Sequence, residues 1–329
     1  MGNRLSQLSE IFPPKPTLTE RNLPDQSGKT FIVTGASSGV GEQLAYILYK
    51  HNAKIYIAAR SEEKSRQAIE RVKTRVPHSS GQMIYLHLDL NDLTTIKRSA
   101  DEFLSQNDRL DVLWNNAGVM TPPQGSTTKQ GYELQLGTNN LAPFLFTKLL
   151  QPILAETARK ASADSVRVVW VSSNGSEHFS VNGGVDLSNM DYKTDKSPFT
   201  KYGNSKAGNI YHGSELARRA GSEGIISVSL NPGGLKTELA RHRARWQQVL
   251  ANWLLYDPIY GAYTELFAGL SPKITSAQNG AYLIPWGRFH PGLRKDLALG
   301  QRTEEEGGTG IAAKFWEWSE QQIKPYVSG

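Results

Sequence analysis

Residues 30–41 read TFIVTGASSGVG, a short apolar run that leads into a loop with three glycines. A strand, a glycine-rich turn and a helix in this order are typical of the first unit of a dinucleotide-binding α/β domain. Gly35 and Gly39 permit a tight turn, and a helix from about Gly41 to Lys50 would offer N–H groups to a pyrophosphate. Such a loop also occurs where a strand meets a helix for steric reasons alone, so the motif needs support from elsewhere in the chain.

Apolar runs alternate with helical stretches over most of the chain. Within residues 92–106, for example, apolar positions recur at the spacing of one helix face. Strands that alternate with helices form βαβ units, so we expect an α/β fold in a single domain, with a doubly wound parallel (Rossmann) sheet of about seven strands. The expected strands are 30–34, 54–59, 83–88, 111–116, 166–172 and 225–230, with 281–287 as a seventh, edge strand that Pro285 closes.

Composition excludes several classes of protein and site. The 329 residues contain no cysteine, which excludes disulfides, thiolate nucleophiles and sulfur-ligated zinc, and no metal site is predicted. The net charge of +6 is dispersed rather than clustered, so we expect no nucleic-acid binding. No apolar run is long enough to span a bilayer and no secretory signal is evident, which predicts a cytoplasmic protein without a transmembrane segment.

The first residues, MGNRLS, match the pattern for N-myristoylation with Gly2 as the acceptor. Acylation would add a peripheral membrane contact, although one acyl chain gives only marginal binding. A chance match in an irregular arm is the simpler interpretation.

Tyr202 and Lys206 lie four residues apart in KYGNSKAGNIYHGSELARR (201–219), a stretch with a helical pattern. Their side chains would share one helix face, with an ammonium beside a phenol. A neighbouring cation lowers the pKa of a phenol, which is normally near 10, and so prepares it for acid/base chemistry. Taken alone, such a pair also occurs on solvated helix surfaces.

Five motifs in order resemble the short-chain dehydrogenase/reductase family over about residues 28–290. They are TGASSGVG (34–41), NNAG (115–118), VSSN (171–174), YGNSK (202–206) and NPGGLKT (231–237). Within this family the chain is most similar to the retinol-dehydrogenase-like group, and to fungal short-chain dehydrogenases of the bli-4 type. The resemblance implies a nicotinamide-dependent oxidoreductase that moves a hydride between an alcohol and a carbonyl.

The resemblance also implies the catalytic roles. Tyr202 would be the acid/base, Lys206 would lower its pKa and hold the nicotinamide ribose, and Ser173 would bind the substrate oxygen. Asn139 matches the asparagine whose backbone carbonyl holds a water beside Lys206. Pro143, four residues later, has no N–H to donate to that carbonyl, although it would also simply kink a helix.

The family pattern further places the NNAG segment beside the adenosine, Asp89 at the adenine edge, and the NPGG turn beside the nicotinamide. The predicted cofactor-binding residues are Gly35, Ser37, Ser38, Gly39, Val40, Gly41, Arg60, Ser61, Asp89, Leu90, Asn116, Ala117, Gly118, Tyr202, Lys206, Pro232, Gly233 and Thr237.

The end of the second expected strand bears on the choice of nicotinamide cofactor. An acidic residue there would bind the ribose hydroxyls of NAD, but the chain has Arg60 and Ser61 instead, which favours the 2′-phosphate of NADP(H) over NAD(H). The opposing interpretation is a solvated Arg60, because the glycine loop carries Ser37 and Ser38 where many NADP-preferring relatives have a basic residue.

One spacing departs from the family. Ser173 and Tyr202 are 29 residues apart, more than in most members, which weakens the choice between Ser172 and Ser173. We interpret residues 174–198 as a loop at the substrate mouth. Three of its side chains would line the pocket or simply pack: His178, Phe179 and Tyr192.

These observations predict three regions along the chain. Residues 1–27, which are rich in proline, form an irregular N-terminal arm; 28–300 form the Rossmann-type catalytic domain; and 301–329 form a C-terminal helical tail. Within the domain, apolar side chains of about 235–256 predict a substrate lid or, equally, a packing surface. The resemblance also implies a homodimer through the helices of Asn139 and Tyr202, unless the tail blocks it.

The expected function is therefore an NADP(H)-dependent oxidoreductase for a small, lipophilic or aromatic alcohol or carbonyl. The first alternative is a non-catalytic sensor that binds NADPH in the same loop. A more distant one is a serine hydrolase, because residues 35–39 also spell G-x-S-x-G with Ser37 as the nucleophile.

Overall fold

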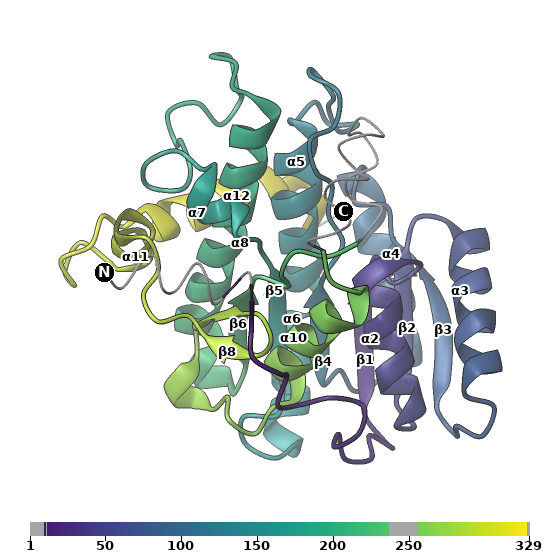
Figure 1. Ribbon diagram of the computed structural model, residues 1–329. Coiled ribbons are helices and arrows are strands. Elements are labelled where there is room, and N and C mark those ends of the chain that lie inside the picture. Colours follow the sequence, from purple (N-terminus) through teal and green to yellow (C-terminus); the bar gives the residue numbers. More distant parts are fainter. Residues whose placement is uncertain (1–9, 11, 237–254, 328–329) are drawn as a thin grey trace.

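An eight-stranded sheet with helices on both faces forms the centre of the protein (Figure 1). The computed structural model describes residues 10, 12–236 and 255–327. The strand order is β3-β2-β1-β4-β5-β6-β7-β8; the first seven are parallel, and β8 is antiparallel to β7. The strands are β1 (Thr30–Thr34), β2 (Lys54–Ala59), β3 (Gln82–His87), β4 (Val112–Asn115), β5 (Arg167–Val171), β6 (Ile226–Leu230), β7 (Tyr282–Ile284) and β8 (Arg288–Phe289).

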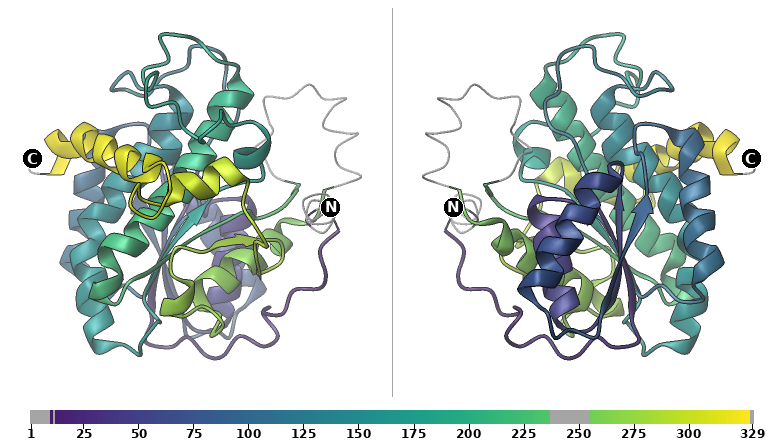
Figure 2. Two further views of the ribbon diagram at one scale, coloured as in Figure 1. Left: turned by 90° about the vertical axis from the view of Figure 1, so that its left-hand side faces the viewer. Right: turned by 90° about the vertical axis from the view of Figure 1, so that its right-hand side faces the viewer.

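The helices form a layer on each side of the sheet, as the two views in Figure 2 show. One apolar cluster joins the sheet to α2, α3 and α10, and a second joins the other face to α4, α6 and α8. A last helix, α12, packs against α4, α6 and α8. The bounds are α2 (Gly39–Lys50), α3 (Glu62–Arg75), α4 (Leu93–Gln106), α6 (Ala142–Lys160), α8 (Pro198–Ala220), α10 (Pro258–Leu270) and α12 (Ile311–Val327).

The described residues also form three shorter α-helices: α5 (Leu134–Leu136), α7 (Gly175–His178) and α11 (Lys295–Gln301). The central strands β1, β5 and β6 are buried along their whole length because helices cover both faces, which explains their runs of apolar residues. The strand order reverses at β1, which pairs with both β2 and β4. Ligands of such sheets bind at the carboxyl ends of the strands near this reversal.

The predicted doubly wound sheet is confirmed, with small differences at the boundaries. The seventh strand is shorter than expected and ends before Pro285, but it is not the edge, because the two residues of β8 pair with it. Helix α2 begins at Gly39 rather than near Gly41.

The described part of the N-terminal arm is largely irregular and lies against the domain. Leu18 and Leu23 are buried in the same cluster as α2 and α10, and the Tyr263 hydroxyl donates to Glu20 at 2.7 Å. Most of the expected lid, and also Gly2 and Thr237, lie outside the described residues. No helix among the described residues has the length and apolarity needed to cross a membrane.

Candidate active site

The glycine loop leaves a narrow cradle between β1 and α2. Gly35 has a φ of +70°, and a Cβ there would lie 2.9 Å from the Ala117 Cα; a Cβ at Gly41 would lie 2.6 Å from Asn116 Nδ2. Side chains at these positions would therefore clash with the NNAG segment. Ser38 is the N-cap of α2, yet its side chain makes no capping hydrogen bond. The N–H groups of the first turn and the helix dipole are thus suited to a phosphate.

The NNAG segment connects this cradle to the catalytic side chains. Asn116 Nδ2 donates to the Thr34 oxygen at 2.6 Å, and the Ala117 N–H donates to the Thr34 hydroxyl at 2.9 Å. A Cβ at Gly118 would lie 3.1 Å from Asn139 Oδ1 and 3.4 Å from Lys206 Nζ. Gly118 therefore brings the segment close to both predicted catalytic residues.

Helix α8 places Tyr202 and Lys206 at the carboxyl end of β5. Lys206 Nζ donates to the Val171 oxygen at 2.9 Å and lies 5.7 Å from the centre of the Tyr202 ring. Both side chains are buried, and burial lowers the pKa of Lys206 to about 8. A Cβ at Gly175 would lie 2.9 Å from Tyr202 Cε1 and 3.4 Å from Ser173 Oγ, so the ring and this hydroxyl face the same small space.

The two serines after β5 have different surroundings. Ser172 is buried, and its hydroxyl donates to the Lys206 backbone oxygen at 2.7 Å. Ser173 is partly exposed, and its hydroxyl accepts from the Gly175 N–H at 3.1 Å. Ser172 thus anchors α8 to the sheet, whereas the Ser173 hydroxyl is accessible to a ligand. This difference supports Ser173 as the substrate-binding serine.

Asn139 lies in a π-helical turn, Gly137–Leu141, just before α6. The Ala142 N–H donates to the Gly137 oxygen five residues back. This wider π-helical turn comes just before Pro143, which has no N–H to donate to the Asn139 oxygen and so interrupts the α-helical hydrogen bonds. Asn139 Oδ1 accepts from the Val119 N–H at 2.8 Å. Asn139 Nδ2 donates to the Val119 oxygen at 3.0 Å and to the Ser205 hydroxyl at 2.9 Å.

The remaining predicted cofactor residues lie along the carboxyl ends of the strands. Arg60 is exposed at the end of β2, and Ser61 caps α3 by accepting from the Lys64 N–H. Asp89 Oδ1 accepts from the Asn91 N–H at 3.0 Å, and the neighbouring Leu90 is buried. Val40 is buried in the first turn of α2, and Ser37 is partly exposed.

Arg71 of α3 was missed by sequence reasoning. It pairs with Glu42 of α2 at 2.8 Å, and its Nη2 lies 3.5 Å from the Ser37 oxygen of the glycine loop. The guanidinium of Arg71 therefore lies beside the glycine loop, although its charge is already paired with the Glu42 carboxylate.

The turn after β6 is held tightly. Gly233 has a φ of +95°, and a Cβ there would lie 2.8 Å from the Trp286 ring. Asn231 is buried, and its Oδ1 accepts from the Gly233 N–H at 3.0 Å. Pro232 is partly exposed between them. Trp286 is a contact that no sequence motif indicated.

A second missed group lies at the same end of β6. His290 Nε2 is 3.2 Å from Glu177 Oε2 of α7 and 3.7 Å from Glu10 Oε1 of the N-terminal arm. These three side chains have the spacing of metal ligands. However, His290 Nδ1 accepts from the Gly292 N–H at 3.1 Å, which places the imidazole proton on Nε2. The arrangement is therefore a hydrogen bond from His290 Nε2 to Glu177, with the Glu10 carboxylate close by, and we call it the Glu10–His290–Glu177 bridge.

Burial and the imidazole affect the two carboxylates of this bridge differently. Burial raises the pKa of Glu10 above its usual value. Burial also acts to raise the pKa of Glu177, but the hydrogen bonds from His290 and from the Arg294 N–H outweigh it, so that the pKa is lowered. Glu177 is thus the ionised acceptor for His290.

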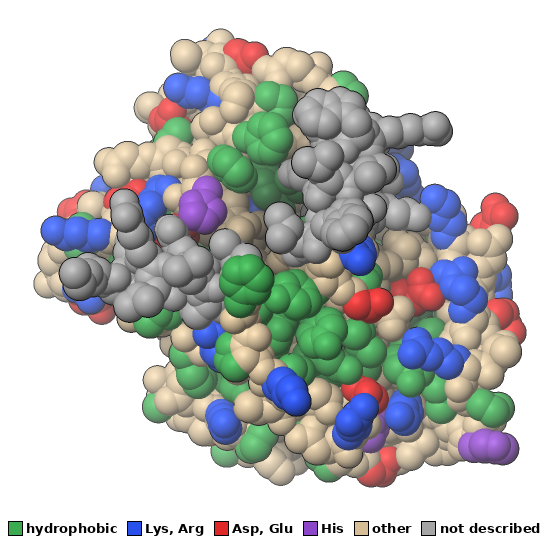
Figure 3. All heavy atoms as spheres, viewed as in Figure 1, with side chains coloured by type: hydrophobic (Ala, Val, Ile, Leu, Met, Phe, Trp, Pro, Cys, Tyr) green, Lys and Arg blue, Asp and Glu red, His purple; other side chains and the backbone are tan. Residues whose placement is uncertain are grey.

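Residues 174–198 are closely packed over α8 and contain α7. Phe179 of this region and Phe199 of α8 are each 42% exposed, and their rings lie 5.3 Å apart. His178 is exposed beside them. Tyr192 instead packs against α8, and burial raises its pKa. Figure 3 shows hydrophobic side chains gathered near the start of α8 and over α10.

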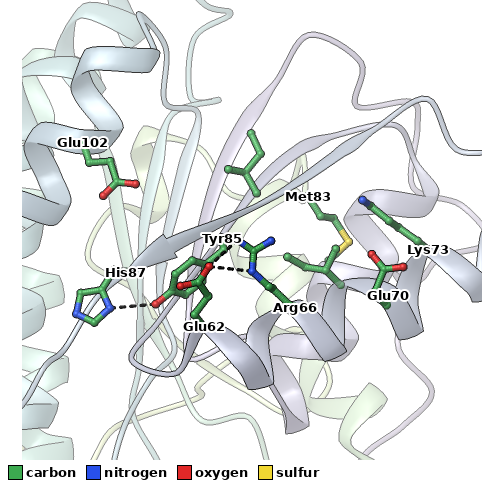
Figure 4. Close-up of a pocket in the computed structure, with 10 residues that line it drawn as sticks. Glu62, Arg66, Glu70, Lys73, Met83, Tyr85, His87 and Glu102 are labelled. Carbon is green, nitrogen blue, oxygen red and sulfur yellow. Dashed lines mark hydrogen bonds and ion pairs between the residues drawn. The ribbon is translucent and has the colours of Figure 1, made fainter.

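The hydrolase alternative has no support in the geometry. Among the described residues, no histidine hydrogen-bonds to Ser37, whose recorded contact is the one with Arg71. A groove of about 700 Å³ lies between α3 and β3, at the edge of the sheet, and its lining mixes apolar side chains with charged ones such as Glu62, Arg66 and Glu102 (Figure 4). None of the predicted catalytic or cofactor residues lines it.

Comparison with known proteins agrees with this geometry. Residues 29–186 match the family described as short chain dehydrogenase. A short-chain dehydrogenase/reductase of Phomopsis amygdali is 52% identical over 325 residues, covering 97% of this chain and 96% of that one. Another of Neocamarosporium betae, bet4, is 46% identical over 326 residues, covering 98% and 94%. The solved structure of an uncharacterized protein from Mycobacterium paratuberculosis matches with a TM-score of 0.68 and 27% identity, covering 93% and 97%. Full-length similarity at this level means that the chain belongs to the short-chain dehydrogenase/reductase family.

Proposed function

We propose that this protein is an NADP(H)-dependent oxidoreductase that interconverts an alcohol and a carbonyl in a lipophilic or aromatic small molecule. The observation that carries the proposal is the meeting of Tyr202, Ser173 and Lys206 around two glycines. A Cβ at Gly175 would lie 2.9 Å from the Tyr202 ring and 3.4 Å from the Ser173 hydroxyl, so both groups border the space that this glycine leaves open, and Gly118 brings the NNAG segment to Lys206. A sensor that only bound the cofactor would not need this arrangement of donors.

In carbonyl reduction, the Ser173 hydroxyl would orient the substrate oxygen, and the Tyr202 phenol would give it a proton. NADPH, when bound, supplies the hydride equivalent that the carbonyl carbon receives. Lys206, protonated below its pKa of about 8, favours the phenolate after proton transfer. The Asn139 carbonyl would hold the water that returns a proton through Lys206. Fixed donors at the developing alkoxide then supply most of the acceleration.

The glycine cradle fits a dinucleotide on its own geometry. Gly35 and Gly41 leave no space for a Cβ, and the first turn of α2 has no side-chain cap. The pyrophosphate would bind at Ser37, Ser38, Gly39 and Val40, with the adenosine between Asp89 and the NNAG segment. The nicotinamide would lie between Lys206 and the Pro232–Gly233 turn.

Arg60 supports NADP(H) over NAD(H). It is exposed at the carboxyl end of β2, where its guanidinium can reach a 2′-phosphate, and Ser61 follows it. No carboxylate at this position would repel the phosphate. Arg71, beside the Ser37 oxygen, adds positive charge nearby but is partly neutralised by Glu42.

The substrate class rests on the aromatic pair Phe179 and Phe199. Both lie close in sequence to proposed catalytic residues: Phe179 follows α7, which begins two residues after Ser173, and Phe199 precedes Tyr202 by three residues on α8. Two exposed rings at 5.3 Å offer an apolar surface to a substrate at Ser173.

A titration of the purified protein with NADPH and with NADH, followed by nicotinamide fluorescence, tests the proposal. We expect tighter NADPH binding, which Arg60→Ala weakens at least tenfold while NADH binding stays unchanged. Arg66→Ala is the matched control, because Arg66 is an exposed arginine paired with Glu62 on α3. Equal binding of both cofactors would refute the preference for NADP(H), and binding of neither would refute the enzyme assignment.

Other expectations stay predictions. They include the likeness to the retinol-dehydrogenase-like and bli-4-type members, the cytoplasmic location and the acylation of Gly2. Helix α12 covers α6 and α8, the helices through which a homodimer was expected to form. Size-exclusion chromatography of the full chain decides between monomer and dimer.

A further inference from the structure

The N-terminal arm reaches the carboxyl end of β6 through Glu10. Asn231 Nδ2 donates to Glu10 Oε2 at 3.0 Å, and Glu10 Oε1 lies 3.7 Å from His290 Nε2. His290 in turn contacts Glu177 of α7, four residues after Ser173. The Glu10–His290–Glu177 bridge thus joins three segments that are far apart in sequence.

This bridge is enclosed rather than solvated. The side chains of His290, Glu10 and Glu177 are 4%, 11% and 17% exposed. The His290 ring lies 5.5 Å from the Tyr282 ring, and the Tyr282 hydroxyl donates to the Ser173 backbone oxygen at 3.2 Å. The bridge therefore adjoins the segment that carries Ser173.

Asn231 connects Glu10 to the Pro232–Gly233 turn, because its side chain makes hydrogen bonds to both. An amide side chain has two ends, and the hydrogen bond of Asn231 Nδ2 to a carboxylate fixes which end faces the Gly233 N–H. Without Glu10, the buried Nδ2 group of Asn231 would lose the carboxylate that accepts from it, and the side chain would be less firmly oriented. Gly233 has a positive φ and lies close to Trp286, so a shift of the Asn231 amide would remove the hydrogen bond that holds the N–H of this turn.

We propose that Glu10 is a positioning residue of the active site, which orients Asn231 and through it holds the Pro232–Gly233 turn in the conformation that binds the nicotinamide end of the cofactor. This inference rests on the proposed function, because the turn is a proposed cofactor contact. It makes the N-terminal arm a part of the working enzyme rather than an appendage.

The test compares Glu10→Ala, Glu10→Gln and Glu20→Ala in the full-length protein. Glu20 is the matched control, because it anchors the same arm to Tyr263 on α10, away from the turn. The readouts are the dissociation constant for NADPH from fluorescence, the midpoint of thermal unfolding, and KM and kcat with a carbonyl substrate. Gln keeps an oxygen that can accept from Asn231 and should therefore rescue binding.

We expect Glu10→Ala to weaken NADPH binding about tenfold, Glu10→Gln to restore most of it, and Glu20→Ala to leave it unchanged. An equal loss in Glu10→Ala and Glu20→Ala would overturn the proposal, because it would mean that the arm acts only through general stability. Unchanged binding in Glu10→Ala would overturn it too. Failure of the unaltered protein to bind NADPH would instead refute the proposed function itself.

Discussion

Lys206 Nζ donates a hydrogen bond to the backbone oxygen of Val171 at 2.9 Å, at the carboxyl end of β5. The sheet thereby fixes a buried ammonium beside the Tyr202 ring, four residues earlier on α8. Burial lowers the pKa of Lys206 to about 8, which still leaves the side chain largely protonated at neutral pH. A fixed cation beside a phenol supports the proposal that Tyr202 exchanges protons.

Tyr202→Phe should therefore reduce kcat by about 10²- to 10⁴-fold, the usual contribution of a general acid, with NADPH binding almost unchanged. Tyr211→Phe is the control on the same helix: its hydroxyl donates to the Gly183 oxygen at 2.7 Å, so its removal should affect stability and not turnover. Steady-state kinetics and fluorescence titration of both variants provide the measurement. Equal activity in Tyr202→Phe and the unaltered enzyme would exclude this tyrosine as the proton donor.

The neighbouring serines should separate catalysis from stability. Ser173→Ala should lower kcat/KM at least tenfold without a large change in unfolding, because the hydroxyl is partly exposed and is the one proposed to bind the substrate oxygen. Ser172→Ala should cost about 1 kcal/mol of the free energy of unfolding, the usual value of one buried hydrogen bond, through loss of its contact with the Lys206 oxygen. The reverse pattern in kinetics and denaturant unfolding would assign the catalytic role to Ser172.

The sequence was sufficient for the sheet and for most of the cradle because these depend on local patterns. Buried parallel strands need runs such as 30–34 and 226–230, and the glycine loop directly follows the first of them. Tyr202 and Lys206 are likewise related by helical spacing alone. The choice between Ser172 and Ser173 came from the family resemblance, and the structure supplies its physical reason in the contact of Ser172 with α8.

Contacts between remote segments could not be predicted in this way. Glu10, Glu177 and His290 come from the arm, from α7 and from the segment after β8, and no local pattern relates them. The same holds for Trp286 against Gly233 and for Arg71 beside Ser37, which depend on how the loops pack. Each residue taken alone looks like an ordinary surface or core side chain.

Glu265 of α10 should make the protein less stable as pH rises. It is completely buried, and neither carboxyl oxygen has a hydrogen-bond partner among the residues that the structure describes. Burial raises its pKa to about 8, against 4.5 when exposed. Between these values the unfolded chain has lost the proton that the folded protein keeps, so stability is full below about pH 4.5 and falls up to about pH 8. The slope approaches about 1.4 kcal/mol per pH unit.

Glu265→Gln should remove this slope, which denaturant unfolding measures between pH 5 and 7.5. This range lies below the Lys206 pKa of about 8, so deprotonation of Lys206 does not add to the slope. Glu215→Gln is a contrasting control, because that buried carboxylate accepts from Arg218 at 2.6 Å and Arg219 at 3.0 Å, and its loss should destabilise the protein. An unchanged slope in Glu265→Gln would show that Glu265 is ionised in the folded protein.

The aromatic pair Phe179 and Phe199 should determine which substrates bind. Each ring is 42% exposed beside the Ser173 and Tyr202 elements, so replacement by Ala removes apolar surface from the substrate side without opening a cavity in the core. We expect each variant to raise KM for an aromatic aldehyde about tenfold, with a smaller effect on a short aliphatic aldehyde and little change in kcat. Phe289→Ala serves as the control, since Phe289 is 39% exposed on β8 and contacts Phe267 of α10. If all three variants raised KM equally, or if aromatic and aliphatic aldehydes were affected alike, the substrate would not bind against this pair, and the preference for aromatic carbonyls would lose its structural basis.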